Sequence, residues 1–170
     1  MTGDERLLAL VATQDRGAFH LLYERYADAA YRYALSILRA PHLAEEVLQE
    51  TMMAVWKGAK NFRGHSKVST WILGIARNQA HNILRKESKG ERLPAEDPSA
   101  ATHDPTRSMH VDLHVQEALE TLSPQHREVM HLVFYEHLTV RETAALLEIP
   151  EGTVKSRMYH ARLALAKELT

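Results

Sequence analysis

The stretch "LTVRETAALLEIPEGTVKSRMYHARLALA", residues 138–166, has the form of two helices joined by a short turn. Thr139 is placed to cap the first helix, and Glu142 follows it at the spacing of a capping box. Pro150 and Glu151 suit the opening turn of the second helix, through a fixed φ and through the helix dipole respectively. The segment therefore predicts a helix-turn-helix.

The second of these helices has an apolar side and a basic side. The apolar arc, which we expect to pack on the core, holds Val154, Met158, Ala161 and Leu165. The polar side suits a DNA major groove, because long cations reach phosphates and guanine edges while hydroxyls and aromatic rings reach bases. Its candidate DNA-binding residues are Thr153, Lys155, Ser156, Arg157, Tyr159, His160 and Arg162. The alternative is a bundle helix with a solvated basic face.

Positive charge is unevenly distributed along the chain. Residues 112–170 hold six Lys or Arg against nine Asp or Glu, yet four of those six basic residues lie in the last helix. Residues 56–86 carry seven basic residues and no acid, although the formal net charge of the 170-residue chain is −1. Two basic segments in a near-neutral protein favour two contacts with a polyanion over ordinary solvated helix faces.

The bulk composition is typical of a globular, water-soluble protein. Hydrophobic residues make up 45% of the chain and charged residues 25%. No apolar run is long enough for a membrane span, and the first residues do not read as a signal peptide. The chain has no cysteine, which excludes disulfides and Cys-based zinc sites. We therefore expect a cytoplasmic protein.

A segment rich in proline and polar residues divides the chain. Residues 86–109, "KESKGERLPAEDPSAATHDPTRSM", contain three prolines and a glycine without any apolar period, which is typical of a linker. Neither side shows the alternation or the hairpin signals of strands. We expect an all-α chain of two small helical domains joined by a flexible linker, the second containing the helix-turn-helix. The predicted bounds are 1–87, 88–111 for the linker, and 112–170.

Apolar periodicity and capping residues predict the individual helices. In the first domain we expect helices at 4–13, 16–39, 42–59 and 70–86. In the second domain we expect helices at 110–122, 123–136 and 139–148, followed by the terminal helix. Ser69 or Thr70 is predicted to cap the fourth helix, and Ser123 to cap the sixth with Pro124 at its first position.

The fourth helix carries a polar stripe. Residues three and four apart share a helix face, which here groups Gly74, Arg77, Asn78, His81 and Arg85. The preceding loop adds an aromatic ring and basic side chains, namely Phe62, Arg63, His65 and Lys67. Such a surface can bind nucleic acid, and polar amides beside an apolar loop can hold a base pulled out of the stack. Trp71 is expected to pack in the core.

Two strings resemble one family over nearly the whole chain: "AEEVLQETMMAVWKGAKNFRGHSKVSTWILGIARNQAHNILRK" (44–86) and "ALETLSPQHREVMHLVFYEHLTVRETAALLEIPEGTVKSRMYHARLAL" (118–165). With a Pro-rich linker between them, the chain resembles the extracytoplasmic-function (ECF) group of bacterial RNA polymerase sigma factors. The resemblance implies two helical domains, called region two and region four. It also implies an alternative sigma factor that binds core RNA polymerase and directs promoter-specific initiation, with an anti-sigma factor as a further expected partner.

The resemblance also implies site residues. The helix that docks on the clamp helices of the largest polymerase subunit maps to Glu45, Glu46, Gln49, Glu50, Met53 and Trp56. The part that reads the melted minus-ten element maps to Phe62, Arg63, His65, Lys67, Arg77, Asn78, His81, Asn82 and Arg85. The terminal helix maps to the reader of the minus-thirty-five element. In the turn before it, Glu148 and Ile149 stand where the family often has glycine.

No catalytic residue, metal or cofactor is predicted. Of the eleven histidines, His110 and His114 are one helical turn apart and could share a metal, but no HExxH motif accompanies them. Chance enrichment on solvated helices is favoured. The alternative function is a one-component or response-regulator transcription factor, which needs a sensor or receiver domain before the linker. A helical metal hydrolase is the enzyme alternative.

Overall fold

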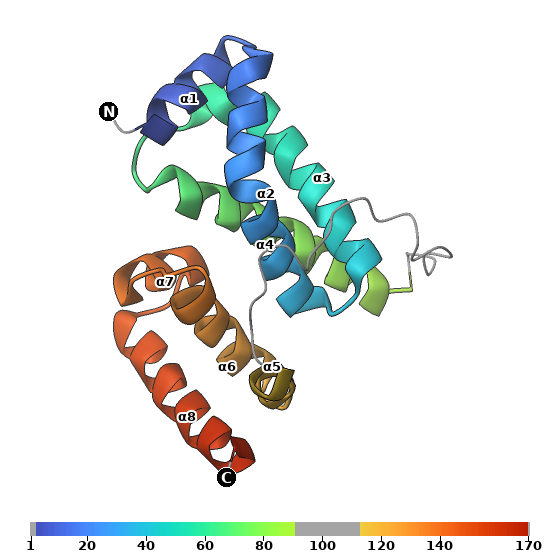
Figure 1. Cartoon of the computed structure of the whole chain (residues 1–170), viewed down its shortest axis with the longest axis vertical. Helices are drawn as coiled ribbons and strands as arrows, with labels where there is room; N and C mark the ends of the chain where they lie inside the picture. Colours follow the sequence, from blue (N-terminus) through green and yellow to red (C-terminus); the bar gives the residue numbers. More distant parts are fainter. Residues whose placement is uncertain (1–2, 91–112, 170) are drawn as a thin grey trace. The chain divides into compact units, whose positions relative to one another are not determined.

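The computed structural model describes residues 3–90 and 113–169, which form two compact units (Figure 1). Helices dominate both units, and no strand occurs within these two ranges. The prediction of an all-α chain with two helical domains is confirmed. The last helix of the first unit reaches Ser88, just past the predicted boundary, and most of the predicted linker lies outside the described residues.

The first unit is a bundle built around one long helix. Its elements are α1 (Gly3–Ala12), α2 (Arg16–Leu38), α3 (Pro41–Gly58), the 3₁₀ turn η1 (Ala59–Asn61) and α4 (Val68–Ser88). Because α2 packs against α1, α3 and α4, it is buried along most of its length. Local chemistry sets where α2 and α3 begin, since the Asp15 side chain caps α2 and Pro41 is the first residue of α3.

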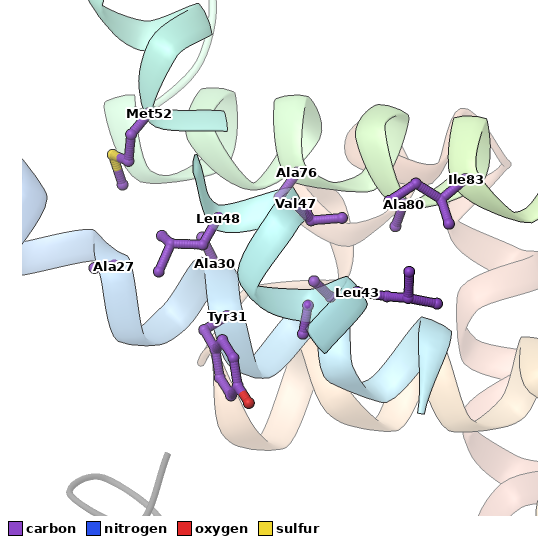
Figure 2. Packing of buried hydrophobic residues seen from close by; sticks show 12 residues of the cluster. Ala27, Ala30, Tyr31, Leu43, Val47, Leu48, Met52, Ala76, Ala80 and Ile83 are labelled. Atoms are coloured by element: carbon purple, nitrogen blue, oxygen red, sulfur yellow. The ribbon is translucent and has the colours of Figure 1, made fainter. Parts of the chain in front are cut away.

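Two hydrophobic clusters hold the first unit together. The larger lies between α2, α3 and α4, and Figure 2 shows its members, among them Ala30, Val47 and Ala76. Small alanines on α2 and α4 let the helix backbones approach closely around the larger side chains of α3. The second cluster joins α1 to the rest through Leu8 and Leu22. Ala30 on α2 is fully buried.

The predicted start of α4 is wrong. Helix α4 begins at Val68 after Lys67, and no side chain caps it. Val68 is 3% exposed and belongs to the second hydrophobic cluster. Because Val68 packs into this cluster, the helix begins there, before the two hydroxyl residues. Ser69 and Thr70 therefore lie inside the first turn, and Thr70 is buried. Packing outweighed capping at this position.

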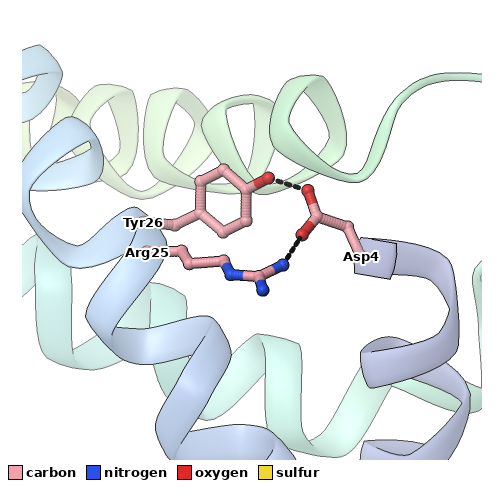
Figure 3. A network of polar contacts seen from close by, with 3 residues as sticks. All are labelled: Asp4, Arg25 and Tyr26. Carbon is pink, nitrogen blue, oxygen red and sulfur yellow. Dashed lines mark hydrogen bonds and ion pairs between the residues drawn. The ribbon is translucent and has the colours of Figure 1, made fainter. Parts of the chain in front are cut away.

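A polar contact fixes α1 against α2 (Figure 3). Asp4 on α1 accepts a hydrogen bond from the Arg25 guanidinium at 2.5 Å, and the Tyr26 hydroxyl donates to the other carboxylate oxygen. Burial, followed by the hydrogen bond to Asp4, raises the pKa of Tyr26 well above its ordinary value of 10.0. The folded state therefore holds this proton more tightly than the unfolded state does.

This linkage predicts an alkaline loss of stability. Because the pKa of Tyr26 is raised by folding, its contribution is fully present below pH 10 and falls as the pH rises above that value. Tyr26→Phe should cost about 1 kcal/mol at neutral pH, the usual value of one hydrogen bond, and should lose stability less steeply above pH 10. Urea unfolding followed by tryptophan fluorescence measures this, since both tryptophans lie in the first unit. Parallel losses in the two proteins above pH 10 would contradict the assignment.

The second unit contains α5 (Leu113–Glu120), α6 (Pro124–Met130), a π-helical turn η4 (His131–Tyr135), α7 (Val140–Leu147) and α8 (Glu151–Leu169). Helix α8 packs against α5, α6 and α7. The predicted Ser123 cap is confirmed, with its hydroxyl 3.3 Å from the His126 amide. The predicted single helix at 123–136 is split, because the α-helix changes to a wider π-helical turn at His131. The His131 ring lies 2.8 Å from the Glu136 carboxylate at the end of this turn.

In the described part of the chain, no helix is both long enough and apolar enough to cross a bilayer.

Candidate nucleic-acid interface

The turn between α7 and α8 sets the direction of the last helix. Both hydrogen bonds of the capping box that the sequence predicts at Thr139 and Glu142 are present, each 3.0 Å long. Helix α7 ends at Leu147, and the next residue, Glu148, has a left-handed backbone with φ 57°. The Ile149 amide then bonds back to Ala144, and α8 begins at Glu151, one residue after Pro150. A tight turn therefore forms without the glycine that the family often uses.

Glutamate at a left-handed position is strained, which gives a prediction. A side chain at positive φ destabilises the folded state by about 1–2 kcal/mol, and glycine avoids this strain. Part of that gain is offset, because glycine has more conformational freedom to lose when the chain folds. We expect Glu148→Gly to stabilise the second unit by about 0.5–1 kcal/mol. Amide hydrogen exchange of α7 and α8 measures the change, with Glu117→Gly in the interior of α5 as a variant expected to destabilise. Equal or faster exchange in Glu148→Gly would contradict the account of the turn.

Helix α8 presents the two sides that the sequence predicts. Val154, Met158 and Ala161 are buried, and Leu165 is half-buried, so the predicted packing arc is confirmed. Among the candidate DNA-binding residues, Thr153 and Arg157 are half-buried. The exposed ones are Lys155, Ser156, Tyr159, His160 and Arg162, and Tyr159 retains 61% of its accessible surface. The basic face of the helix is therefore open to a ligand.

Two neighbouring elements contribute rings to this face. Phe134 on η4 is 47% exposed and lies under the Arg162 guanidinium, 5.5 Å from it. His126 on α6 stacks on His160, with ring centroids 6.2 Å apart. Helical periodicity within α8 cannot find these residues, because they come from other elements. Their contacts hold two of the exposed α8 side chains in place.

The loop between η1 and α4 is anchored at one end and open along its length. Phe62 is half-buried against Trp71, with ring centroids 5.3 Å apart, and both rings pack on the second hydrophobic cluster. The remaining candidates of the loop are all exposed: Arg63, His65 and Lys67. Gly64 adopts a positive φ of 78°, which turns the chain sharply between the two basic side chains that flank it. The loop thus projects three polar side chains from a fixed aromatic base.

The polar stripe of α4 lies opposite the side that enters the core. Asn78 and Arg85 are exposed, whereas Arg77, His81 and Asn82 are half-buried. The Arg85 guanidinium donates a hydrogen bond to the Asn82 side chain one turn earlier. The loop and the stripe follow each other along one segment of the first unit, from Phe62 to Arg85.

Helix α3 supplies the candidates for protein docking. Gln49, Glu50 and Met53 are exposed, with 52% of the Met53 surface accessible, and Glu46 is half-buried. Trp56 is half-buried with its ring against the edge of Phe19 at 5.3 Å.

Glu45 differs from the other docking candidates. Its side chain is 7% exposed, which argues against a direct contact with a partner. Its charge acts inside the fold instead: burial first, and then the Glu45 carboxylate, raise the pKa of Tyr31 on α2.

Family comparisons cover both units. Residues 22–90 match Sigma-70 region 2, and residues 113–165 match Sigma-70, region 4. The ECF RNA polymerase sigma factor SigM of Mycobacterium tuberculosis is 33% identical over 98% of this chain and 84% of its own length.

This chain belongs to the ECF sigma factors.

Further relatives agree with this assignment. The RNA polymerase sigma-H factor of Pseudomonas aeruginosa is 29% identical over 98% of this chain and 93% of its own. Among solved structures, the sigma factor RpoE of Bartonella quintana, crystallised with the anti-sigma factor NepR, has a TM-score of 0.72 and 26% identity. It covers 89% of this chain and 96% of its own. CnrH, in complex with the cytosolic domain of CnrY, shares the fold with a TM-score of 0.73 and 22% identity, over 99% and 97% of the two chains.

Membership in the ECF group makes this chain an alternative sigma factor, a factor for transcription initiation. Region 2 spans α2 to α4 and so contains the docking candidates and the polar stripe, whereas region 4 contains the helix-turn-helix. Among the residues that the structure describes, no group of three His, Asp or Glu could hold a metal ion. Of the histidine pair noted in the sequence, His114 is exposed and His110 lies outside the described residues.

Proposed function

We propose that this sigma factor binds core RNA polymerase through the outer face of α3 and holds promoter DNA at two places. Its first domain, residues 1–87, reads the minus-ten element with the loop and α4. Its second domain, residues 112–170, reads the minus-thirty-five element with α8. The observation that carries the proposal is the exposed basic face of α8 in an otherwise acidic domain.

The face of α8 supports base recognition as well as phosphate binding. Lys155 supplies a long cation for phosphates or guanine edges, while the Ser156 hydroxyl and the Tyr159 ring can contact base edges and thymine methyl groups in a major groove. The capping box of α7 and the packing of Val154 orient the helix before DNA arrives. A pre-oriented helix loses less conformational entropy on binding.

The loop and α4 support binding of a melted strand. Phe62 and Trp71 give the loop a fixed base, so the exposed side chains around Gly64 can close on an unstacked nucleotide. Asn78 and Arg85 continue the polar surface along the helix. Single-strand binding of this kind combines a basic track with groups that contact exposed bases.

The outer face of α3 supports docking to a basic protein surface. Gln49, Glu50 and Met53 form an exposed acidic and apolar patch, which we call the docking patch, with Glu46 at its border. Glu45 is left out of this patch because it is buried. Met53 offers a flexible apolar anchor of the type found at protein interfaces.

We also propose an anti-sigma factor as a regulatory partner. The support is the likeness to RpoE of Bartonella quintana, whose solved structure is a complex with an anti-sigma factor. The polymerase supplies the chemistry of RNA synthesis, and this chain acts in the cytoplasm as a specificity subunit rather than as an enzyme.

The test is transcription in vitro with purified bacterial core polymerase and a library of genomic fragments from the source organism. The proposal predicts specific start sites that require the sigma factor and share two sequence elements. Specific starts in its absence, or none with a folded sigma factor that co-purifies with core polymerase, would overturn it.

A further inference from the structure

A cavity of about 280 Å³ lies in the first unit where α1, α3 and η1 meet. It is lined by Ala12, Gln14, Trp56, Lys57 and Lys60. None of the five lining residues is acidic. Lys57 and Lys60 belong to the acid-free stretch of the sequence, but no resemblance or motif assigns them a role.

The polar side-chain groups of this cavity have no partner among residues 3–90 and 113–169. Lys57 and Lys60 are exposed and form no ion pair or hydrogen bond with any described residue. The Gln14 side chain and the Trp56 indole N–H likewise have no hydrogen bond within the described residues. Two neighbouring ammonium groups without an acid repel each other, and an anion between them removes that repulsion.

The walls of the cavity are held in place. Trp56 is fixed by its edge-on contact with Phe19. Gln14 has a left-handed backbone with φ 69°, and its amide bonds to Val11 at 2.8 Å. The Thr13 hydroxyl bonds to Leu10 at 2.7 Å in the same turn. These contacts fix the walls, so the freedom lost when a ligand binds is mainly that of the two lysine side chains.

We propose that this cavity binds a nucleotide, with its phosphate between Lys57 and Lys60 and its base against the exposed part of the Trp56 ring. Lysine is a point-charge donor that suits phosphate, and indole is a sequence-tolerant surface for a base. The nucleotide comes either from the melted promoter strand or from the free pool. The first source rests on the proposed function, because Lys60 lies two residues before Phe62, where the minus-ten loop begins.

The test follows Trp56 fluorescence in the full chain carrying Trp71→Phe, which leaves Trp56 as the only tryptophan. Single-stranded dT12 and adenosine monophosphate are titrated separately at low salt. We expect quenching by at least one of them, weakened about tenfold in the double variant Lys57→Gln/Lys60→Gln. For dT12, the slope of log affinity against log salt should fall by about 0.7, the share of one phosphate contact with a single strand.

The matched control is Lys86→Gln/Lys89→Gln, which removes the same charge from the other end of α4. Trp71, in the first turn of that helix, lies beside Gly58, so the control lysines stand about 20–30 Å from the cavity. The control should bind as the parent does. Quenching by dT12 alone assigns the site to the promoter strand, and quenching by adenosine monophosphate assigns it to a free nucleotide.

No quenching by either probe, or equal weakening in the two double variants, would overturn the proposal. Transcription in vitro separates this result from the proposed function. Specific transcription without quenching would reject the nucleotide site and leave the proposed function standing. Quenching without specific transcription would support the nucleotide site and reject the proposed function.

Discussion

Transcription from a promoter that depends on its upstream element should fall steeply when Lys155 and Tyr159 are both changed to alanine. Each side chain is exposed on the DNA face of α8, and a good base contact contributes about 1–3 kcal/mol of discrimination, or about 5- to 150-fold. The double variant should therefore lose about 5- to 150-fold in initiation, the range of one good base contact, because the effects of residues four apart on a helix face do not simply add. Abortive initiation on linear promoter DNA measures the loss.

The control for this prediction is Lys167→Ala, near the far end of the same helix, which should initiate nearly normally. A promoter whose upstream element is scrambled should be weak and should respond little to Lys155→Ala/Tyr159→Ala. Equal sensitivity of the intact and scrambled promoters would show that α8 contributes only non-specific charge. That result would contradict the assignment of α8 as a base reader.

Reversing the charge of the docking patch should remove polymerase binding. In Glu50→Arg combined with Met53→Ala, a repulsive cation replaces the acid and the exposed apolar anchor is lost. Truncating a well-placed interface contact costs about 2 kcal/mol or more, and charge reversal adds repulsion, so affinity for core polymerase should fall by at least about 30-fold. Competition against a labelled sigma factor for core polymerase measures it.

Two controls separate docking from folding. Glu87→Arg reverses an exposed acid at the end of α4 and should leave core binding unchanged. Glu45→Gln alters the buried acid of α3, so it should change the stability of the first unit more than its affinity for polymerase. Undiminished binding by Glu50→Arg/Met53→Ala would reject the docking patch.

The sequence predicts most helix limits because side chains close in sequence determine them. Ser123 caps α6, and Thr139 with Glu142 forms the capping box of α7, both as expected, whereas Pro41 opens α3 one residue before the predicted start. Each of these features depends on hydrogen bonds or backbone angles within one turn. The packing side of α8 is local for the same reason, since a regular helix repeats every 3.6 residues.

The sequence-based predictions fail where contacts between different helices determine the structure. The hydroxyls at Ser69 and Thr70 looked like caps, but Val68 enters the core and starts α4 earlier. Phe134 and His126 join the face of α8 from other elements, and the cavity beside Trp56 needs three elements to form. None of these features has a sequence spacing that indicates it.

Helical spacing in the sequence indicates that Glu45 is buried. Glu45 and Met52 are seven residues apart, so they lie on the same side of α3, and Met52 is buried. The docking prediction followed a family motif instead of that periodicity. The burial of Glu45 therefore limits the docking candidates to residues on the outer side of α3.

Footprinting of the complete holoenzyme on one promoter tests the central claim, that two separate units of this chain hold one promoter at two places. Hydroxyl-radical cleavage should reveal two protected segments. Lys155→Ala/Tyr159→Ala should expose the upstream segment, and Arg63→Ala/Asn78→Ala should suppress permanganate-reactive thymines in the downstream one. One protected segment, or a pattern that neither pair of substitutions alters, would contradict the account.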